Sequence, residues 1–376
     1  YIPQKLMFRD SQLTAVAETL APLLNNSRSS NLLLYGKTGT GKTVLVKYVL
    51  QRLQERADKQ GMDISLSYTN TRVANTEYRI LYELGQQLNT EIPFTGLSSS
   101  EASGRLLARI NEKKIHAVLV FDEIDFLVKS SGDKLLYEMS RANERLTDGF
   151  ITLVGISNDL KFKEFLDPRV LSSLSEEEVV FPPYTVDELK IILKKRSETA
   201  FHVGTIDEGA INLCAALAGM EHGDARRAVD TLRVAGEVAE RQGANNVEEK
   251  HVRTAVQKID QDRMTDALIS LPLHQKILLL SIRNSHKENT TGPIHNQYQR
   301  ICSNIGTEPL TLRRISGLLS ELTLLGVISS KVISHGRYGR TKAINLLINN
   351  ELLIDTLQKD NLISPLLNSK ILNLNI

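Results

Sequence analysis

Short hydrophobic runs occur along the first part of the chain. Residues 32–35, 118–121 and 151–156 are almost entirely apolar, and residues 64–68 alternate between apolar and polar side chains. Runs that are apolar on both faces are typical of parallel strands covered by helices. The stretches between them have helical spacing, which predicts helices over residues 42–57, 76–88, 101–111 and 135–147. This alternation predicts an α/β domain with a parallel sheet over residues 1–183.

The pattern changes after the Pro182-Pro183 pair, where strand-like runs stop and helical spacing continues. Thr185–Glu188 and Thr205–Glu208 have the spacing of capping boxes, which begin helices. Asn246 stands where an N-cap residue would begin a further helix. We therefore predict an all-helical domain of about four helices over residues 184–264.

The last segment, residues 265–376, has the pattern of three helices followed by a hairpin. Helices are expected over residues 268–282 and 297–305, and a third has core-facing apolar residues at helical spacing: Leu312, Ile315, Leu318, Leu319 and Leu322. Two short strands follow, at residues 327–328 and 343–348, on either side of a Gly/Arg turn at residues 335–340. This order is typical of a winged helix, which is a helix-turn-helix variant.

Charge is distributed unevenly, although the whole chain carries a net charge of only +2. Residues 265–348 contain 10 basic and 4 acidic residues, whereas residues 1–264 are close to neutral. A basic module of this kind is typical of a domain that binds a polyanion. The two cysteines, Cys214 and Cys302, form no CxxC motif, and the chain has no run of about 18 apolar residues. We therefore expect a soluble cytoplasmic protein.

The segment after the first predicted strand fits the phosphate-binding pattern G-x-x-x-x-G-K-[ST]. It consists of Gly36, Lys37, Thr38, Gly39, Thr40, Gly41, Lys42 and Thr43. Glycines in such a loop let backbone N–H groups surround phosphate oxygens at a helix N-terminus. Lys42 would then contact the β- and γ-phosphates of ATP, and the Thr43 hydroxyl would bind Mg²⁺. The alternative is a merely flexible loop, which the strand-loop-helix context disfavours.

A second pair of candidate residues ends the buried run at residues 118–121. Asp122 falls at the carboxyl edge of the sheet, where open α/β sheets bind ligands, and would contact the metal ion. Glu123 follows it and would orient and polarise an attacking water. The alternative is that these acidic residues only cap the next helix. The nearby phosphate loop favours the catalytic interpretation.

Three further polar residues fall where such a site needs them. Asn158 follows the strand at residues 151–156 and could share the water with Glu123, or could be an ordinary loop residue. Arg169 lies on a helical stretch and could reach the γ-phosphate of a neighbouring subunit, or form a surface salt bridge. Arg226 begins a helix of the second domain and is a candidate residue of the site. Alternatively, it could form an ion pair with Asp230.

These motifs, taken in order, resemble those of an AAA+ ATPase. The Walker A, Walker B, sensor 1, arginine-finger and sensor 2 motifs would be Gly36–Thr43, Asp122–Asp125, Asn158, Arg169 and Gly223–Arg227. The order of ATPase domain, helical lid and winged helix resembles, over essentially the whole chain, the archaeal origin-recognition initiators. These are relatives of the eukaryotic origin-recognition and helicase-loading ATPases.

The resemblance implies cofactors, partners and further site residues. ATP or ADP would bind with Mg²⁺, and the adenine pocket would include Ile2, Pro3, Arg9 and Tyr184. The implied partners are double-stranded origin DNA, a paralogous initiator protomer on adjacent DNA and the replicative MCM helicase. The protein would then be associated with the nucleoid. Initiators of this kind carry an extra DNA-contacting helix in the ATPase domain, and residues 93–105 are the candidate insertion.

The basic C-terminal module contains the candidate DNA-binding residues. The third predicted helix would present small and basic residues to a major groove at its first turns. A glycine-flanked turn with two arginines and a tyrosine suits insertion into a minor groove. The candidates are Thr311, Arg313, Arg314, Ser316, Arg337, Tyr338 and Arg340. The alternative is a solvated charged face without a ligand.

The favoured hypothesis is an ATP-controlled replication initiator that hydrolyses ATP slowly, as a switch. A signalling ATPase of the STAND type, which regulates transcription through its winged helix, is the main alternative. Proteins of that type usually append a repeat-rich sensor domain, and no such repeats occur in this sequence. A processive ring motor is a third possibility. It is disfavoured because no aromatic pore loop precedes Asp122.

Overall fold

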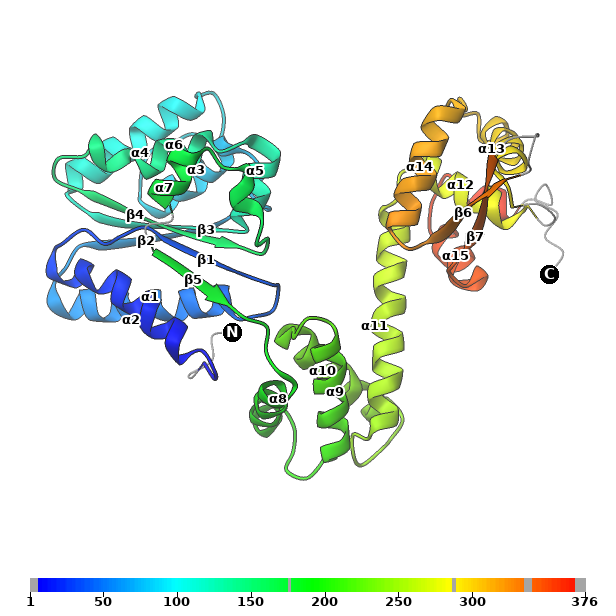
Figure 1. Ribbon diagram of the computed structural model, residues 1–376, viewed down its shortest axis with the longest axis horizontal. Helices are drawn as coiled ribbons and strands as arrows, with labels where there is room; N and C mark the ends of the chain where they lie inside the picture. The colour runs from blue at the N-terminus through cyan, green and yellow to red at the C-terminus, as the bar shows by residue number, and fades with distance from the viewer. Residues whose placement is uncertain (1–5, 175–176, 286–288, 335–339, 369–376) are drawn as a thin grey trace. The chain divides into compact units, whose positions relative to one another are not determined.

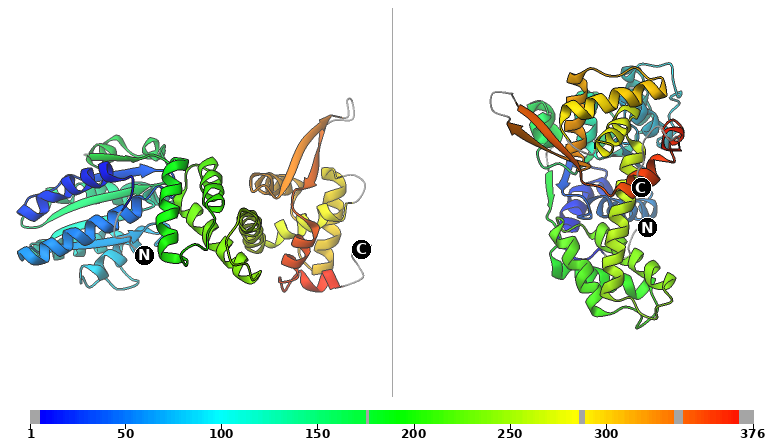
Figure 2. Two further views of the ribbon diagram at one scale, coloured as in Figure 1. Left: turned by 90° about the horizontal axis from the view of Figure 1, so that it is seen from below. Right: turned by 90° about the vertical axis from the view of Figure 1, so that its right-hand side faces the viewer.

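The computed structural model describes residues 6–174, 177–285, 289–334 and 340–368. The chain divides into two units, Tyr1–Ala255 and Val256–Ile376. Helix α11 (Glu249–Ser270) contains the boundary between them, so the expected domain boundary at residues 264–265 falls inside this helix. Figures 1 and 2 show the elements of each unit.

Five parallel strands form the sheet in the described part of the first unit. They are β1 (Leu32–Gly36), β2 (Ile64–Asn70), β3 (His116–Asp122), β4 (Phe150–Ser157) and β5 (Glu177–Phe181). The order across the sheet is β2-β3-β4-β1-β5, and every neighbouring pair is parallel. The predicted α/β fold with a parallel sheet is therefore confirmed.

Helices cover both faces of this sheet, as Figure 1 shows. One face carries α1 (Asp10–Leu20) and α2 (Lys42–Gln60), and the other carries α3 (Glu77–Gln87), α4 (Ser99–Lys113), α5 (Ile124–Ser131), α6 (Lys134–Ser140) and α7 (Pro168–Leu174). Side chains of β3 alternate between two cores: Val118 and Val120 join one, and Leu119 and Phe121 join the other. The continuous apolar run in the sequence is a consequence of this two-sided burial.

Two expectations for the first unit were wrong. Strand β5 was not predicted, because its first residues, Glu177 and Glu178, are exposed charges on an edge strand. The helix expected over residues 135–147 ends at Ser140, and a short 3-10 turn follows. The Asn143 amide explains this ending: it donates to the Ile151 carbonyl at 2.7 Å and accepts from the Ile151 N–H at 2.8 Å, which fastens the turn to β4.

A lid of helices follows the sheet and confirms the predicted all-helical segment. It contains α8 (Val186–Ala200), α9 (Glu208–Met220), α10 (Ala225–Arg241) and the start of α11. The capping box at Thr185–Glu188 is present. The capping box expected at Thr205 is not formed, because α9 begins after Asp207, and Asn246 is not the N-cap residue that was expected, because α11 begins at Glu249. Ile206 and Val247 instead pair in an isolated β-bridge.

The second unit has the predicted winged-helix order. Its elements are α12 (Leu273–Arg283), α13 (Thr291–Ile305), α14 (Leu312–Leu324), β6 (Ile328–Ser334), β7 (Arg340–Leu346), α15 (Asn350–Leu357) and α16 (Ser364–Asn368). Strands β6 and β7 are antiparallel, and Figure 2 shows their hairpin projecting from the helices of the unit. Within the part of the chain that the structure describes, no helix is long and apolar enough to span a bilayer.

Two details of the second unit differ from expectation. The single helix expected over residues 268–282 is broken at Pro272, so that α11 ends at Ser270 and α12 begins at Leu273. Proline has no N–H to donate within a helix, which explains the break. Leu312 is 51% exposed and does not face the core, whereas Ile315, Leu318, Leu319 and Leu322 are buried as predicted.

We expect Leu119→Ala to lower the free energy of unfolding of the first unit by about 2–5 kcal/mol, since it leaves a cavity in a fully buried strand. Val203→Ala is the control, because Val203 is fully exposed and its truncation should change stability by less than about 0.5 kcal/mol. Urea denaturation followed by circular dichroism measures both. Equal midpoints for the two variants would contradict the expected role of Leu119.

Candidate nucleotide-binding site

Most of the residues predicted to bind nucleotide meet at the carboxyl edge of the sheet. Because β1, β4 and β3 are parallel neighbours, the residues that follow them lie close together. A cavity of about 1110 Å³ opens there between the sheet and the lid. Ten of the predicted residues line it: Thr38, Gly39, Gly41, Lys42, Thr43, Asp122, Glu123, Asn158, Tyr184 and Arg226.

The phosphate loop connects β1 to the first residue of α2. Gly39 and Gly41 have φ values of +73° and +97°, which only glycine adopts without strain. The ammonium group of Lys42 is buried and donates to the carbonyls of Gly36 and Lys37, at 2.9 and 2.8 Å. Burial lowers the pKa of Lys42 to about 8, although Asp122 and Asp125 oppose this shift. The loop is thus shaped for an anion, with a lysine that interacts with the loop carbonyls.

The Asp122 carboxylate is held by three donors. Its Oδ2 accepts from the Thr43 hydroxyl at 2.8 Å and from the Tyr68 hydroxyl at 2.6 Å, and its Oδ1 accepts from the Glu123 N–H at 2.9 Å. A hydroxyl beside a carboxylate, next to a phosphate loop, is a donor set that suits Mg²⁺ together with nucleotide phosphates. Elsewhere among the described residues, no group of three or more His, Cys, Asp and Glu side chains has the arrangement of a metal site.

The Glu123 side chain is oriented by an unusual backbone conformation. Glu123 has a φ of +56°, in the left-handed region that non-glycine residues rarely adopt. One carboxylate oxygen accepts from the Asn70 amide at 3.4 Å, and the other lies 3.7 Å from the Arg72 guanidinium. These contacts are long, so Glu123 is guided to the cavity without being tightly fixed there.

Asn158 reaches the cavity from the turn after β4. Its backbone N–H donates to the Asp125 carboxylate at 3.1 Å, and the Ser157 hydroxyl donates to the same oxygen at 3.1 Å. Asp125 therefore fixes the turn that presents the Asn158 side chain. The Asp122–Asp125 segment thus supplies both the carboxylate beside Thr43 and a support for the turn at Asn158.

The first turn of α10 brings the lid into contact with the phosphate loop. Asp224 caps this helix by accepting from the N–H groups of Arg226 and Arg227, at 2.8 and 3.1 Å. The Ala225 N–H donates to the Gly39 carbonyl at 3.3 Å, and a Cβ atom on Gly39 would lie 1.7 Å from Asp224 Oδ1. The ion pair of Arg226 with Asp230 is not formed, because Asp230 accepts from Arg233 instead, at 2.8 Å.

Arg9, which the family resemblance places at the adenine pocket, contacts both the phosphate loop and Tyr184. Its buried guanidinium donates to the carbonyls of Thr40 and Pro182, at 2.9 and 2.7 Å, and lies 3.8 Å from the centre of the Tyr184 ring. Arg9 is not among the described residues that line the cavity, whereas Tyr184 is. Arg9 thus joins the phosphate loop to the segment that leads into the lid. Ile2 and Pro3 lie outside the described residues.

Arg169 lies away from the cavity of its own chain. It is on α7 with 73% of its side chain exposed, and its guanidinium donates twice to the Asp167 carboxylate, each time at 3.0 Å. The guanidinium also lies 5.5 Å from the centre of the Tyr137 ring. The surface salt bridge weighed as the alternative is therefore present, and Arg169 is oriented at the surface of the ATPase domain.

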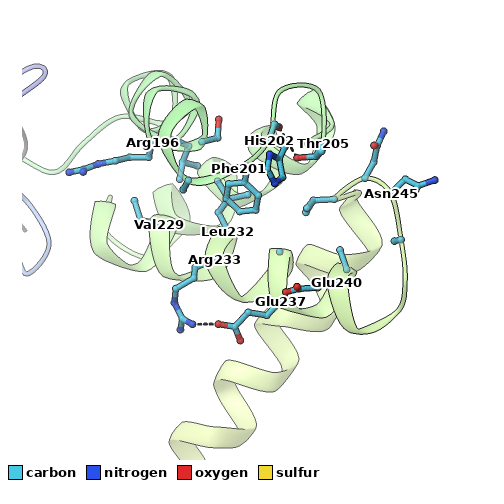
Figure 3. Close-up of a pocket in the computed structure, with 18 residues that line it drawn as sticks. Arg196, Phe201, His202, Thr205, Val229, Leu232, Arg233, Glu237, Glu240 and Asn245 are labelled. Atoms are coloured by element: carbon cyan, nitrogen blue, oxygen red, sulfur yellow. Dashed lines mark hydrogen bonds and ion pairs between the residues drawn. The ribbon is translucent and has the colours of Figure 1, made fainter.

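A second cavity, of about 620 Å³, lies within the lid between the end of α8 and α10 (Figure 3). The Phe201 ring lies against Gly236, where an added Cβ atom would come within 2.6 Å of it. Arg233 and Glu237, which pair with each other, also line this cavity. None of the described residues that the sequence analysis selected for nucleotide binding lines it, so we place the candidate site in the larger cavity.

The candidate DNA-binding residues belong to the second unit. Thr311 is the N-cap of α14, and its hydroxyl accepts from the Arg314 N–H at 3.5 Å. Arg313 and Arg314 are exposed at the start of this helix, and Ser316 is half-buried. Arg337 and Tyr338 lie outside the described residues, as does the side chain of Arg340, whose backbone begins β7.

Sequence reasoning missed two residues of β2 that line the cavity, Tyr68 and Asn70. Both contact the acidic pair that ends β3, since β2 and β3 are neighbours in the sheet. The sequence offers one signal for them: Tyr68 ends the strand predicted over residues 64–68, and Asn70 follows it closely. This signal does not identify them as site residues unless it is known that the strand lies beside β3.

Three family models match different parts of the chain. They describe an AAA domain at residues 25–161, a Cdc6 AAA+ ATPase-type lid domain at residues 190–257 and a CDC6 C-terminal winged helix domain at residues 266–356. Their order along the chain is the order of the sheet, the lid and the winged helix in the structure.

Curated relatives match nearly the whole chain. An ORC1-type DNA replication protein of Pyrococcus furiosus is 47% identical over 98% of this chain and 89% of its own length. ORC1-type DNA replication protein 1 of Sulfurisphaera tokodaii is 44% identical over 97% of this chain and 92% of its own length.

Solved structures show the same architecture. The Aeropyrum pernix ORC1 protein in complex with DNA is 44% identical and superposes with a TM-score of 0.87, over 97% of this chain and 96% of that chain. The Aeropyrum pernix ORC2 protein, solved as ADPNP-ADP complexes, is 24% identical with a TM-score of 0.61, over 98% and 97% of the two chains. This second likeness concerns the fold.

The pKa of Lys42 predicts how nucleotide affinity depends on pH. Lys42 carries its charge below a pKa of about 8 and loses it above, so ADP affinity should fall by up to about tenfold per pH unit as the pH rises past 8. Calorimetry between pH 7 and pH 9.5 measures this. Lys42→Arg is the control, because a guanidinium stays charged throughout and should flatten the profile. A pH-independent affinity of the wild-type protein would contradict the prediction.

Proposed function

Because this chain belongs to the family of ORC1-type DNA replication proteins, we propose that it is an ATP-dependent initiator that binds replication-origin DNA and helps to recruit or load the replicative MCM helicase. The observation that carries the proposal is the convergence of Lys42, Asp122 and Arg226 on one cavity between the ATPase domain and the lid. A nucleotide held there would contact both parts, which is what a nucleotide-controlled switch requires.

Nucleotide binding would change the contacts of Lys42. The ammonium group now donates to two loop carbonyls, and phosphate oxygens would replace these acceptors. Arg226 would add a second positive charge from the lid. Thr43 and Asp122 would hold Mg²⁺, which would neutralise charge on the transferred phosphoryl group. The Ala225–Gly39 contact ties the lid to the phosphate loop, so the occupant of the loop would influence the lid.

Slow, switch-like hydrolysis fits the arrangement of two residues. Glu123 is the proposed base, and its carboxylate is engaged by Asn70 and Arg72. Arg169 is oriented at the surface and does not line the cavity of its own chain. We propose that Arg169 acts on the nucleotide of an adjacent paralogous protomer, so that fast turnover would require assembly on DNA.

DNA binding would use two surfaces, one on each unit. Arg313 and Arg314 begin α14, the helix that a winged helix inserts into a major groove. In the ATPase domain, the proposed insertion at residues 93–105 includes Phe94, which is 61% exposed and lies under the Arg79 guanidinium, 4.8 Å from the ring centre. The solved DNA complex of the Aeropyrum pernix ORC1 protein supports a DNA-binding role for this chain.

A pull-down of genome fragments, followed by footprinting, tests the proposal directly. We expect the wild-type protein to enrich a few intergenic fragments and to protect two neighbouring stretches, one for each surface. Lys42→Ala should abolish ATP binding, because it removes the phosphate-contacting cation, and should leave basal DNA binding in place. Uniform recovery of fragments would contradict the initiator function. Normal ATP hydrolysis by Lys42→Ala would contradict the site assignment.

Replacement of Arg313 tests the winged-helix contact separately. Arg313→Ala should weaken binding to the enriched fragment by about 1–3 kcal/mol if the guanidinium reads a base, and should lower the log–log salt slope by about 1 if it contacts a phosphate. Lys359→Ala is a matched control, since it removes one exposed positive charge from the same unit outside α14. Titrations at several salt concentrations distinguish the two contacts. Identical binding curves for both variants would argue against α14 as the recognition helix.

A further inference from the structure

Tyr68 is a residue of the site for which the proposed nucleotide chemistry has no role so far. It lies on β2, at the edge of the sheet, and its ring lines the nucleotide cavity. Its hydroxyl donates to Asp122 Oδ2 at 2.6 Å, the same oxygen that accepts from the Thr43 hydroxyl at 2.8 Å. The Asp122 carboxylate therefore links two hydroxyl groups, that of Tyr68 on β2 and that of Thr43 in the phosphate loop.

We propose that Tyr68 is a positioning residue of the magnesium site, which holds the Asp122 carboxylate and, through it, the Thr43 hydroxyl. This inference rests on the proposed nucleotide-dependent function. The Thr43 hydroxyl has one hydrogen, and while that hydrogen is donated to Asp122 the oxygen lone pairs point elsewhere. An Asp122 carboxylate held in place by Tyr68 would therefore orient the neutral Thr43 oxygen toward a metal ion.

The Tyr68 ring is held in place by contacts on its backbone and on its face. The Gln87 side chain accepts from the Tyr68 N–H at 2.8 Å and donates to the Tyr68 carbonyl at 2.9 Å, so it pairs with the free edge of β2 as a further strand would. The Lys47 ammonium group lies over the ring, 4.2 Å from its centre. Contacts on the backbone and on the ring face thus leave the hydroxyl aimed at Asp122.

The chemistry of the hydroxyl suits this role. The phenol has a single hydrogen, and the structure shows it donated to Asp122 Oδ2. The other oxygen of Asp122 is held by the Glu123 N–H, which no side-chain replacement removes. Loss of the Tyr68 hydroxyl would leave the shared oxygen to Thr43 alone, and the carboxylate plane could then turn. Partners of this kind typically affect metal affinity by about 10–100-fold when they are removed.

Tyr68→Phe tests the proposal, because it deletes one oxygen and keeps the ring. Calorimetry would measure ADP affinity in EDTA and at a series of Mg²⁺ concentrations. We expect the affinity in EDTA to be unchanged, and the Mg²⁺ concentration that gives half of the affinity gain to rise about tenfold. Tyr35→Phe is the matched control, since Tyr35 lies on β1 of the same sheet and donates to the Glu178 carboxylate at 2.8 Å, outside the cavity lining. This control should retain the wild-type Mg²⁺ dependence.

The outcomes separate this inference from the proposed function. An unchanged Mg²⁺ midpoint in Tyr68→Phe would overturn the positioning role, and so would an equal loss of affinity with and without Mg²⁺, which indicates general damage to the fold. A wild-type protein that binds no nucleotide would instead overturn the proposed function, and this inference with it. Gln87→Ala is a second variant, which keeps the Tyr68 hydroxyl and removes the contacts on its backbone. A shift of the Mg²⁺ midpoint in the same direction, smaller than that of Tyr68→Phe, supports the positioning role. If the midpoint of Tyr68→Phe is unaltered, the positioning role is overturned whatever the result for Gln87→Ala.

Discussion

All strands of the sheet run in the same direction, and this constraint decides where chemistry can take place. Parallel strands place their carboxyl ends at one edge, so residues that are 79 positions apart in sequence, Thr43 and Asp122, come within hydrogen-bonding distance at 2.8 Å. The helix N-terminus after β1 adds backbone donors at the same edge.

The lid contacts this edge of the sheet through Asp224, which both caps α10 and packs against the phosphate loop. Asp224 caps α10 through its carboxylate, and the same side chain occupies the space above Gly39. A residue larger than glycine at position 39 would collide with this cap. The phosphate loop and the lid are therefore fitted to each other, and the position of Arg226 in the cavity follows from the start of α10.

Local patterns in the sequence and the family resemblance predicted the architecture and ten of the residues that line the cavity, whereas contacts between residues far apart in sequence could not be predicted. The phosphate loop, Asp122, Asn158 and Arg226 could be selected because each follows a strand or begins a helix. Arg9, for example, donates to the carbonyls of Thr40 and Pro182, which are 31 and 173 positions away, and no local pattern reveals these contacts. Strand β5 was not predicted, because an edge strand with exposed glutamates lacks the apolar run of a central strand.

Asp122 and Glu123 are adjacent in sequence, and the structure gives their carboxylates opposite properties. Three donors within 2.9 Å fix the Asp122 carboxylate, as a group that holds an ion in place requires. Glu123 is turned by its left-handed backbone into a place where its contacts with Asn70 and Arg72 are 3.4 and 3.7 Å long. A base that must turn toward a water and accept its proton cannot be bound as tightly as a metal-site carboxylate. One strand end thus supplies a carboxylate held by three short hydrogen bonds and a second with two long contacts, which suits the roles proposed for Asp122 and Glu123.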